Sequence, residues 1–392
     1  MTTRSLGATH ITQSVEYART LIHMPSVTPD DGGCQMFIAE QLAHFGFSCE
    51  HYQINNVSNL VARWGQGSRH IAFSGHTDVV PPGPLEHWQF EPFVATISES
   101  RLYGRGAADM KTGIAAMLSA TARTVASVSP ENVSFWWLIT SDEEGEAEDG
   151  SKWIKQYLDE QGVTLDMCLV GEPSASQYTG DTIKVGRRGS LSASVKITGK
   201  QGHVAYPQHC NNAIHKAAAI IQALLAYPWD EGSADFPGTT LQVTHVDSGT
   251  FTDNLAPGSG RIEFNVRYSS EYNQASLTRL LTELIKAVDP TAAITWSRPC
   301  EAFLSQPRTG KCLIRAAESA IVKATGRYPL ISTSGGTSDG RFFASEQTQV
   351  VELGVPNTSI HQVNENIHLS DLLTLEDVYT DMLMALFSDG EC

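Results

Sequence analysis

Short apolar runs that each end in a polar loop recur along the first half of the chain. Runs of this kind cover residues 59–64, 71–75, 134–140 and 167–170. Four to eight apolar residues bounded by turn residues are typical of buried strands in a parallel or mixed sheet. Helical spacing in the intervening segments predicts helices over residues 12–24, 34–45, 110–125 and 149–158. This half of the chain therefore predicts an α/β domain.

The pattern changes to strict alternation in the second half. Residues 191–197 and 262–268 alternate apolar and polar side chains, as strands with one covered face do. Two further strands and two helices are expected, over residues 239–246, 292–296, 213–225 and 277–288. The order β-α-β-β-α-β predicts a ferredoxin-like α+β domain. We expect this domain over residues 189–299, inserted into a discontinuous α/β domain that comprises residues 1–188 and 300–392.

The α/β character returns after the insertion. Helical spacing predicts helices over residues 311–325 and 375–387, and an apolar run predicts a strand over 350–353. A loop of small residues covers 332–341, and a polar loop covers 359–365.

Size and charge restrict the class of protein. The chain has 392 residues, more than one typical domain of about 100–200 residues, so two domains are expected. Its 41% hydrophobic and 18% charged residues are ordinary for a soluble globular protein. The net charge of −16 disfavours nucleic acids and anionic membranes as partners. A small anionic substrate remains compatible, provided that basic side chains gather locally.

The cysteines indicate a reducing compartment. There are seven, an odd number, and they are scattered without a C-x-x-C pair. This favours reduced thiols in a cytoplasmic protein over a disulfide framework or a thiolate zinc site. Residues 1–11 lack a basic segment followed by an apolar core, so we expect no signal peptide.

Acidic and imidazole side chains follow three of the expected strands. His76 and Asp78 come after the run at 71–75, Glu143 and Glu144 after 134–140, and Glu172 after 167–170. Ligands of open α/β folds collect at the carboxyl ends of strands, so these side chains are expected to lie together. Each pair alone is also compatible with a solvated turn, but the same chemistry at three strand ends indicates a site.

Two further residues extend this set. The glycine-rich segment 102–113 lacks the Gly-Lys-Ser/Thr ending of a phosphate loop, so nucleotide binding is not expected. It instead brings Asp109 to the start of a helix, where an acid is also a common capping residue. His361 lies in the loop 359–365.

Imidazoles and carboxylates without thiolates are typical of catalytic zinc sites. Five such residues suffice for two neighbouring metal ions that share one ligand. Asp109 is the expected bridge, because a neutral imidazole offers a single lone pair to a metal. His76 and Glu172 would then hold one ion, and Glu144 and His361 the other.

Two carboxylates are left for other roles. Glu143 is expected to act as the general base for the attacking water, because it is not needed as a ligand. If its segment is extended, its side chain points away from that of Glu144. Asp78 is expected to reach back to the His76 imidazole and orient it.

At these residues the chain resembles the dinuclear zinc aminoacylase and carboxypeptidase family. Four segments are shared across the wider family, namely SGHTDVVPPG, LYGRGAADMKTG, ITSDEEG and VGEP. Four more are specific to some members, namely GDTIKVGRRGSL, GKQGHVAYP, STSGGTSDGRF and SIHQVNENIHL. The resemblance covers nearly the whole chain, from about residue 59 to 370. It implies a mixed-sheet zinc-peptidase-like catalytic domain with two Zn²⁺ per subunit, Co²⁺ being an alternative in one site.

The resemblance also implies roles for individual residues. His361 matches the ligand histidine, whereas His368 falls where close relatives carry arginine and is a bystander. His203 matches a histidine of the inserted lid and dimerisation domain that acts on the partner subunit of a homodimer, where it stabilises the oxyanion; without the resemblance it reads as a surface histidine. Five positions match substrate contacts, namely Arg187, Asn254, Arg267, Gly336 and Thr337.

The specific segments match family members that act on N-succinyl-LL-2,6-diaminopimelate. The resemblance therefore implies amide hydrolysis of this compound to succinate and LL-2,6-diaminopimelate, in bacterial lysine and diaminopimelate biosynthesis. Its three carboxylates suit arginine side chains, which bind carboxylates in bidentate fashion. The alternatives are an N-acyl amino acid deacylase acting on a substrate such as N-acetylornithine, a dipeptidase, or a non-catalytic zinc-dependent binding protein.

Overall fold

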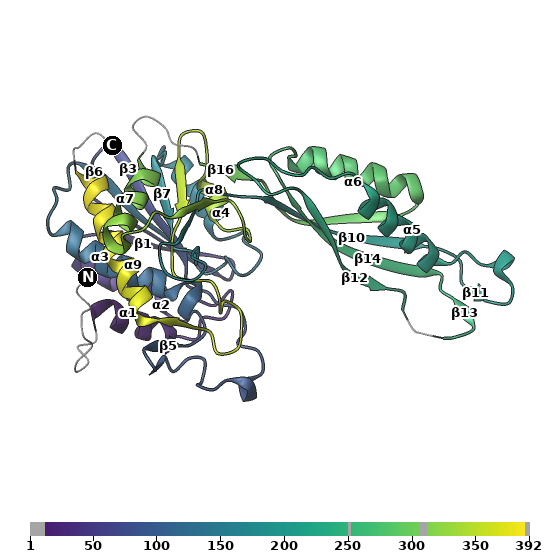
Figure 1. The fold of residues 1–392 in the computed structure, drawn as a ribbon, viewed down its shortest axis with the longest axis horizontal. Helices are drawn as coiled ribbons and strands as arrows, with labels where there is room; N and C mark the ends of the chain where they lie inside the picture. Colours follow the sequence, from purple (N-terminus) through teal and green to yellow (C-terminus); the bar gives the residue numbers. More distant parts are fainter. Residues whose placement is uncertain (1–11, 250–251, 306–311, 389–392) are drawn as a thin grey trace. The chain divides into compact units, whose positions relative to one another are not determined.

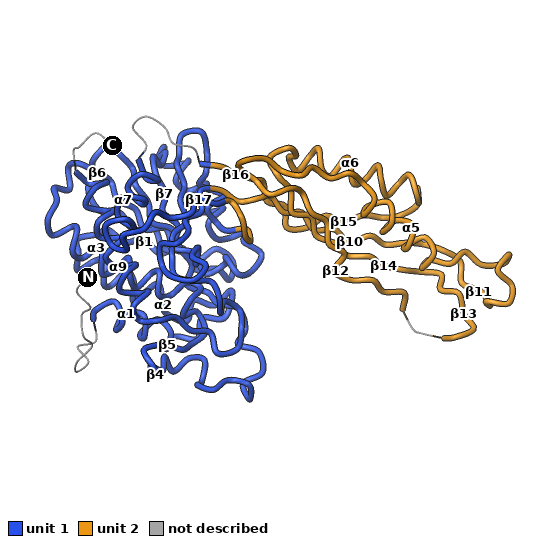
Figure 2. Tube along the Cα trace, in the orientation of Figure 1, with its two compact units in different colours: residues 1–185, 305–332, 338–392 blue, residues 186–304, 333–337 orange. Residues whose placement is uncertain are grey.

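The computed structural model describes residues 12–249, 252–305 and 312–388. The chain forms two compact units, coloured separately in Figure 2. Unit 1 comprises residues 1–185, 305–332 and 338–392, and unit 2 comprises residues 186–304 and 333–337. The segment 1–11, for which no signal peptide is expected, and residue 311, the expected start of a helix, lie outside the described residues.

A mixed eight-stranded sheet forms the centre of unit 1, in the order β1-β2-β6-β3-β7-β18-β8-β17. The central strands β6, β3, β7 and β18 are parallel to one another. Strand β2 is antiparallel to β6, and β1 is antiparallel to β2. The strands are β1 (Ser48–Ile54), β2 (Val57–Trp64), β3 (Arg69–His76), β6 (Val133–Thr140), β7 (Met167–Val170), β8 (Thr182–Lys184), β17 (Leu330–Ser332) and β18 (Gln349–Glu352). Every residue of β6 and β7 is buried, as continuous apolar runs predict.

Helices pack around this sheet (Figure 1). They are α1 (Gln13–Ile22), α2 (Cys34–His44), α3 (Thr112–Val125), α4 (Ser151–Glu160), α7 (Leu313–Thr325), α8 (Gly340–Phe343) and α9 (Leu369–Phe387). Helix α3 packs against α1 and α9. The buried carboxylate of Glu376 on α9 joins the three, because it accepts hydrogen bonds from Ser14 (2.5 Å) and Ser119 (2.8 Å).

A smaller sheet and two short helical turns complete unit 1. A three-stranded sheet in the order β19-β5-β4 brings β19 (Asn366–His368) beside β5 (Arg101–Tyr103) and β4 (Thr96–Ser98). A short turn η1 (Leu85–His87) precedes it, and a wide helical turn η2 (Ala107–Lys111) leads into α3.

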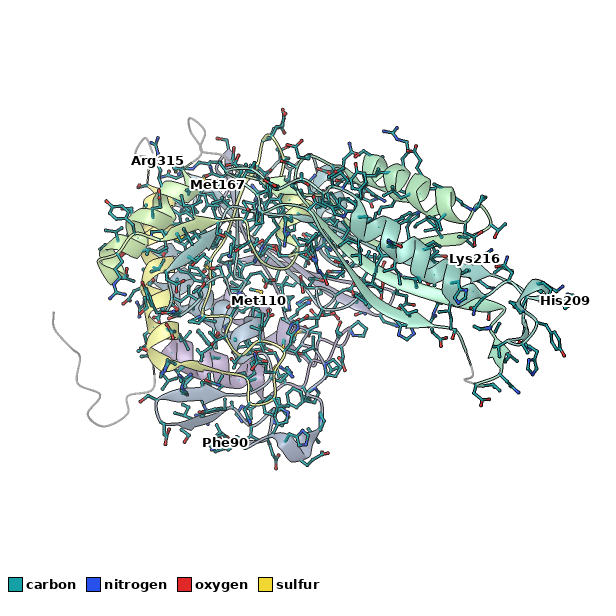
Figure 3. All side chains as sticks on the ribbon, turned by 45° about the vertical axis from the view of Figure 1, so that its right-hand side comes forward. Phe90, Met110, Met167, His209, Lys216 and Arg315 are labelled. Atoms are coloured by element: carbon teal, nitrogen blue, oxygen red, sulfur yellow. The ribbon has the colours of Figure 1, made fainter. Side chains whose placement is uncertain are left out.

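Gly75, at the end of β3, allows the η2 segment to lie against the strand. A Cβ atom there would come within 2.6 Å of Met110 Cε. The Met110 side chain, labelled in Figure 3, is fully buried, and its sulfur accepts from the His76 backbone N–H at 3.4 Å. The absence of a side chain at Gly75 therefore determines where the residue next to Asp109 can pack.

Unit 2 has the predicted β-α-β-β-α-β order. Its sheet, β12-β14-β10-β15, is antiparallel throughout. The elements are β10 (Gly189–Thr198), α5 (Ala213–Ala226), β12 (Thr240–Asp247), β14 (Ser259–Tyr268), α6 (Gln274–Val288) and β15 (Ala293–Cys300). The inward side chains of β10 and β14 pack on Leu277 and Leu281 of α6. Lys216 of α5, labelled in Figure 3, lies 3.2 Å from Asp289 after α6.

Short pairs of strands complete unit 2. A small pair joins β11 (Gly202–His203) to β13 (Leu255–Ala256), and the turn η3 (Pro207–His209) follows β11. A second pair joins β9 (Gly186–Arg187) to β16 (Phe303–Leu304). With the mixed sheet of unit 1, this arrangement confirms the predicted α/β fold class with a ferredoxin-like α+β part.

The structure departs from the sequence-based expectations in several elements. Strand β1 was not predicted, because its residues are mostly polar and partly exposed. Helix α3 begins at Thr112 rather than Met110, since Asp109 and Met110 have non-helical backbone angles. Helix α9 begins at Leu369, six residues before the expected start. Among the described residues, no helix has the length and apolar character needed to cross a membrane.

The cysteines partly follow expectation. Cys34, Cys49, Cys168, Cys210 and Cys300 form no disulfide. Cys312, by contrast, is disulfide-bonded, so the expectation of reduced thiols is wrong at that position. A disulfide requires only that two cysteines approach each other in space, and scattered positions in the sequence do not exclude this.

Candidate metal centre

The sheet order brings three strand ends together. His76 is the last residue of β3, and its neighbours β6 and β7 run parallel to it on either side. Glu143 and Glu144 follow β6 in a turn, and Glu172 follows β7 by two residues. Because parallel strands end at the same edge of a sheet, their loops carry these side chains to one place.

Asp109 lies between two imidazoles. Its Oδ1 atom is 3.2 Å from His76 Nε2, and its Oδ2 atom is 3.4 Å from His361 Nε2. A second carboxylate accompanies each imidazole: Glu172 Oε1 lies 3.6 Å from His76 Nε2, and Glu144 Oε1 lies 3.0 Å from His361 Nε2. Each half of the site thus holds one imidazole and one further carboxylate, and the halves share Asp109.

Asp78 orients both His76 and the turn after β6. Its backbone carbonyl lies 2.9 Å from His76 Nδ1, and its Oδ1 atom lies 3.5 Å from the same nitrogen. A carbonyl can only accept, so Nδ1 carries a proton, and Nε2 is the ring nitrogen that faces Asp109. The Asp78 carboxylate accepts from the backbone N–H groups of Glu143 (3.3 Å) and Glu144 (3.1 Å). The sequence suggested only the side-chain contact to His76.

The ligand atoms of the site form two overlapping groups. His76, Asp109 and Glu144 make one, and His76, Glu143 and Glu172 make the other, with all atoms of a group within 4.8 Å of one another. Residues 143–146 form a turn rather than the extended segment considered from the sequence. Glu143 therefore belongs to the Glu172 side of the site, and Glu144 to the His361 side.

The raised pKa values of two carboxyl groups indicate that the site is suited to a cation. Burial raises the pKa of Glu143 well above its usual value, and the nearby carboxylates of Asp339 and Glu144 add to this, whereas His76 opposes it. Burial and the carboxylates of Asp109 and Glu143 likewise raise the pKa of Glu172. Carboxylates gathered out of water cannot all remain charged without a cation beside them.

The pKa values of the two imidazoles are raised as well, which favours their charged form. Hydrogen bonds to Asp109 and Glu144 raise the pKa of His361 to about 10, although partial burial works against this. For His76, burial lowers the pKa, but the contacts to Asp109, Asp78 and Glu172 outweigh it and leave the pKa well above the usual value. Without another cation in the site, protons on the two histidines serve as the counter-charge.

The donor set fits divalent metal ions. Glu172 Oε1 is buried and has no hydrogen-bond partner, as expected for an oxygen reserved for a ligand. Imidazole nitrogens and carboxylate oxygens are the ligands of catalytic zinc. The buried ammonium of Lys111 donates to the carbonyls of Leu21 (2.9 Å) and Met24 (2.7 Å) and not to a carboxylate of the site.

Two buried acids near the site were not singled out from the sequence. Asp339 lies in the loop before α8, with Arg341 Nη2 3.9 Å away. Glu365 is buried four residues after His361 and pairs with Arg105 at 2.6 Å. Both lie within the motif segments quoted above, where Asp339 is two residues before Arg341 and Glu365 follows Asn364; no other signal in the sequence pointed to them.

Within unit 2, the expected substrate residues lie in separate places. Arg187 on β9 donates to the Ser334 carbonyl at 2.8 Å, which brings it beside the loop that contains Gly336 and Thr337. Gly336 is exposed, and Thr337 is half-buried. Arg267 lies near the end of β14, opposite Ser190 of β10.

His203 and Asn254 lie at the other end of β14. His203 on β11 pairs with Leu255 of β13, and the Val204 N–H donates to the Asn254 carbonyl at 3.1 Å. Both His203 and Asn254 are exposed. Within one unit 2, the length of β14 separates this pair from Arg267.

Comparisons with known proteins agree over nearly the whole chain. The family model described as peptidase family M20/M25/M40 matches residues 72–385. Succinyl-diaminopimelate desuccinylase 1 of Alteromonas mediterranea is 64% identical over 376 residues, which cover 95% of this chain and 96% of the relative. Succinyl-diaminopimelate desuccinylase 2 of Shewanella loihica is 47% identical, with 94% and 99% covered.

Solved structures share the fold at low sequence identity. The M20 family metallo-carboxypeptidase Sso-CP2 of Sulfolobus solfataricus has a TM-score of 0.80 at 16% identity, with 95% of this chain and 99% of that chain covered. The YXEP protein of Bacillus subtilis, described as a dinuclear metal binding peptidase, has a TM-score of 0.69 at 13% identity, with 95% and 97% covered. The chain therefore belongs to peptidase family M20/M25/M40, a family of metal-dependent hydrolases, and has the mixed α/β fold of that family.

Proposed function

We propose that the protein hydrolyses the succinyl amide of N-succinyl-LL-2,6-diaminopimelate to succinate and LL-2,6-diaminopimelate, in bacterial lysine and diaminopimelate biosynthesis. Two relatives named as desuccinylases of this compound, at 64% and 47% identity over nearly the whole chain, support the substrate. The chemistry rests above all on one observation, the carboxylate of Asp109 with one oxygen facing each imidazole. We also propose a cytoplasmic location, which is supported by the absence of a disulfide at Cys34, Cys49, Cys168, Cys210 and Cys300, although not by the disulfide of Cys312.

Two Zn²⁺ ions per subunit would be held here, with Co²⁺ as an alternative in one site. Asp109 would bridge them, His76 and Glu172 would hold one, and Glu144 and His361 the other. When bound, such ions polarise an amide carbonyl and lower the pKa of a water molecule. Asp78 supports both halves, because it fixes the His76 imidazole and the backbone of Glu144.

Glu143 is proposed as the general base. Its carboxylate accepts a proton from the attacking water and transfers it to the departing amine nitrogen, so the C–N bond breaks as a neutral amine leaves. The raised pKa of the Glu143 carboxyl suits it to hold that proton between the two transfers. The carboxylates of Asp339 and Glu144 contribute to this shift.

The substrate carries three carboxylates and one ammonium group, so an acidic protein needs local cationic groups to bind it. We propose that Arg187 and Arg267 bind carboxylates of the substrate, because guanidinium groups match carboxylates in bidentate geometry. Three further contacts are proposed at Asn254, Gly336 and Thr337. The contact between Arg187 and the Ser334 carbonyl supports a shared role for Arg187 and the loop of Gly336 and Thr337.

We further propose a homodimer in which His203 stabilises the oxyanion in the partner's active site. From Ser259 to Arg267, β14 extends for about 26 Å, at roughly 3.3 Å per residue. One small substrate cannot contact His203 and Arg267 of the same unit 2 across that length. The exposed apolar side chains of Val204 and Val246, and the unpaired outer edge of β12, support unit 2 as the dimerisation part.

In this proposal, residues 1–188 and 300–392 form the catalytic domain, and residues 189–299 form the lid and dimerisation domain. The test is release of primary amine from N-succinyl-LL-2,6-diaminopimelate, measured with Zn²⁺ and after chelation, beside N-acetylornithine. Metal-dependent release from the succinyl compound alone is expected. Release from N-acetylornithine alone would overturn the proposed substrate and the arginine assignments. Zinc binding without hydrolysis of any amide would overturn the enzymatic proposal.

A further inference from the structure

The carboxylate of Glu365 is buried against the segment that carries Asp109. Its Oε1 atom accepts from the backbone N–H groups of Ala108 (2.8 Å) and Asp109 (3.1 Å). Its Oε2 atom accepts from the Gly106 N–H (3.0 Å) and from Arg105 Nη1 (2.6 Å). A carboxylate has about four lone-pair positions, and all four are used here. Glu365 therefore has no capacity left to bind a metal or a substrate.

The backbone of Asp109 needs such support. Asp109 has φ −124° and ψ 97°, and Met110 has φ −131° and ψ 30°, so neither continues the helix that follows. The Asp109 N–H donates to the Glu365 side chain instead of to a backbone carbonyl. The two bonds to Glu365 Oε1 hold the peptide groups on either side of Ala108 and thereby fix where the Asp109 side chain begins.

Glu365 is also tied to the segment of His361. His361 and Asn364 have positive φ values, 60° and 62°, which are uncommon for residues other than glycine. Ser359 and Asn366 close the segment through hydrogen bonds of 2.7 Å and 3.1 Å. The Glu365 carbonyl accepts from the Gly104 N–H at 3.0 Å, so the main chain of Glu365 joins the same two segments as its side chain.

We propose that Glu365 is a positioning residue, which holds Asp109 and His361 at their mutual distance before metal binds and so sets the affinity of the metal site that they share with Glu144. This inference rests on the proposed metal centre. Residues outside the ligand shell that fix ligand orientation typically change metal affinity by about 10- to 100-fold when they are replaced.

The test is Zn²⁺ affinity of the metal-free full-length protein, measured by competition with a chelating dye. Glu365→Gln replaces one oxygen by an NH₂ group, which cannot accept from the backbone N–H groups or from Arg105. Because Asp109 is the proposed bridge, we expect both Zn²⁺ equivalents to bind more weakly, the one held by Glu144 and His361 by about 10- to 100-fold.

Glu376→Gln is the matched control. Glu376 is also a buried carboxylate with an arginine partner, Arg123, and hydroxyl donors at Ser14 and Ser119, but its partners belong to α1 and α3. This variant should lose thermal stability and keep wild-type zinc affinity at both equivalents. Equal weakening of zinc binding in both variants would show a general effect of destabilisation and overturn the role of Glu365.

A double variant separates orientation from charge. Arg105→Met combined with Glu365→Leu removes the ion pair as a whole and leaves the Ala108 and Asp109 N–H groups without their acceptor. The proposal expects zinc binding to remain weak, and recovery of wild-type affinity would overturn it.

If Glu365→Gln does not fold, Glu365→Asp, which keeps the charge but shortens the reach, should show the same weakening. Failure of the wild-type protein itself to bind zinc would overturn the metal centre as a whole, whereas wild-type binding with an unchanged variant would overturn this inference alone.

Discussion

At the scale of single residues, the two oxygens of Asp109 distinguish this site from an ordinary acidic cluster. Each oxygen faces a different imidazole, and each imidazole has its own further carboxylate, Glu172 or Glu144. A sequence shows only that such residues follow strands. Which carboxylate lies between the histidines depends on the unusual backbone of Asp109, and no residue pattern encodes that backbone directly.

Replacing Glu143 by Gln should lower kcat by about 10²–10⁴-fold, because an amide cannot take up the proton of the attacking water. Zinc stoichiometry should stay near that of the unchanged protein, since the five proposed ligands are intact. Glu148→Gln is the control, because Glu148 is an exposed acid of the same loop that pairs with Lys152. Steady-state kinetics and metal analysis on the same samples decide the outcome. Loss of both metals from the Glu143 variant would instead assign it as a ligand.

Zinc binding should release protons at neutral pH. In the metal-free protein the pKa of His361 is raised to about 10, so the imidazole is protonated at pH 7 and must lose that proton to bind a metal. Apparent zinc affinity should therefore rise with pH up to about 10. Calorimetry in two buffers of different ionisation enthalpy measures the protons released. The variant His361→Gln should release fewer, and an identical count would contradict the assignment of the proton to His361.

The same raised pKa gives the metal-free fold a pH dependence of its own. A histidine whose folded pKa lies above its unfolded value of about 6.5 stabilises the fold fully below that value. Its contribution is lost as pH rises through about 10. Metal-free protein should thus lose stability between these pH values, and His361→Gln should lose less, as urea unfolding at a series of pH values would measure. Equal losses in both proteins would contradict this linkage.

At the scale of elements, the apolar runs were reliable guides and the polar strands were not. The fully buried strands β6 and β7 were predicted within one residue of their bounds, because burial on both faces leaves an unbroken apolar run. Strand β1 was missed because its edge position leaves it largely exposed and polar. The start of α3 was misplaced because Asp109 and Met110 are held by contacts to distant residues such as Glu365, which outweigh local helical preference.

The close contact between β3 and the η2 segment can be tested at Gly75. A Cβ atom at 2.6 Å from Met110 Cε must displace that side chain, which should destabilise the Gly75→Ala variant by about 1–3 kcal/mol. Combining it with Met110→Ala should remove the clash. The double variant should therefore lose less stability than the sum of the losses in the two single variants. Chemical unfolding of the four proteins completes the cycle. Strict additivity would show that the contact carries no strain.

At the scale of the whole molecule, hydrophobic patterning predicted an α/β part and a ferredoxin-like α+β part, whereas it did not predict how subunits assemble. Period-two alternation over residues 191–197 and 262–268 predicted a sheet with one covered face, and the buried core of unit 2 confirms it. The same pattern cannot show which exposed apolar side chains face a partner, because single exposed apolar residues are common on any protein surface.

Mixing two inactive variants tests whether His203 acts across subunits. In a dimer of Glu143→Gln with His203→Ala, one active site has both an intact base and an intact histidine from the partner. Random exchange makes half of the dimers mixed, with one of two sites repaired, so about a quarter of wild-type activity should return. Each variant alone is the control. No recovery after confirmed subunit exchange would show that His203 acts within its own chain or not at all.

A substitution of Asp78 would remove its side-chain contacts but not its main-chain contact. The atom that fixes the His76 tautomer is a main-chain carbonyl, which every codon at position 78 supplies. The atoms that hold the Glu143 turn belong to the side chain, which a single base change can remove. Genetic drift at this position would therefore erode the placement of the proposed base Glu143 and of the proposed ligand Glu144, while the orientation of His76 persisted. A lineage that lost turnover in this way would keep the half of the site that is built on His76, Asp109 and Glu172.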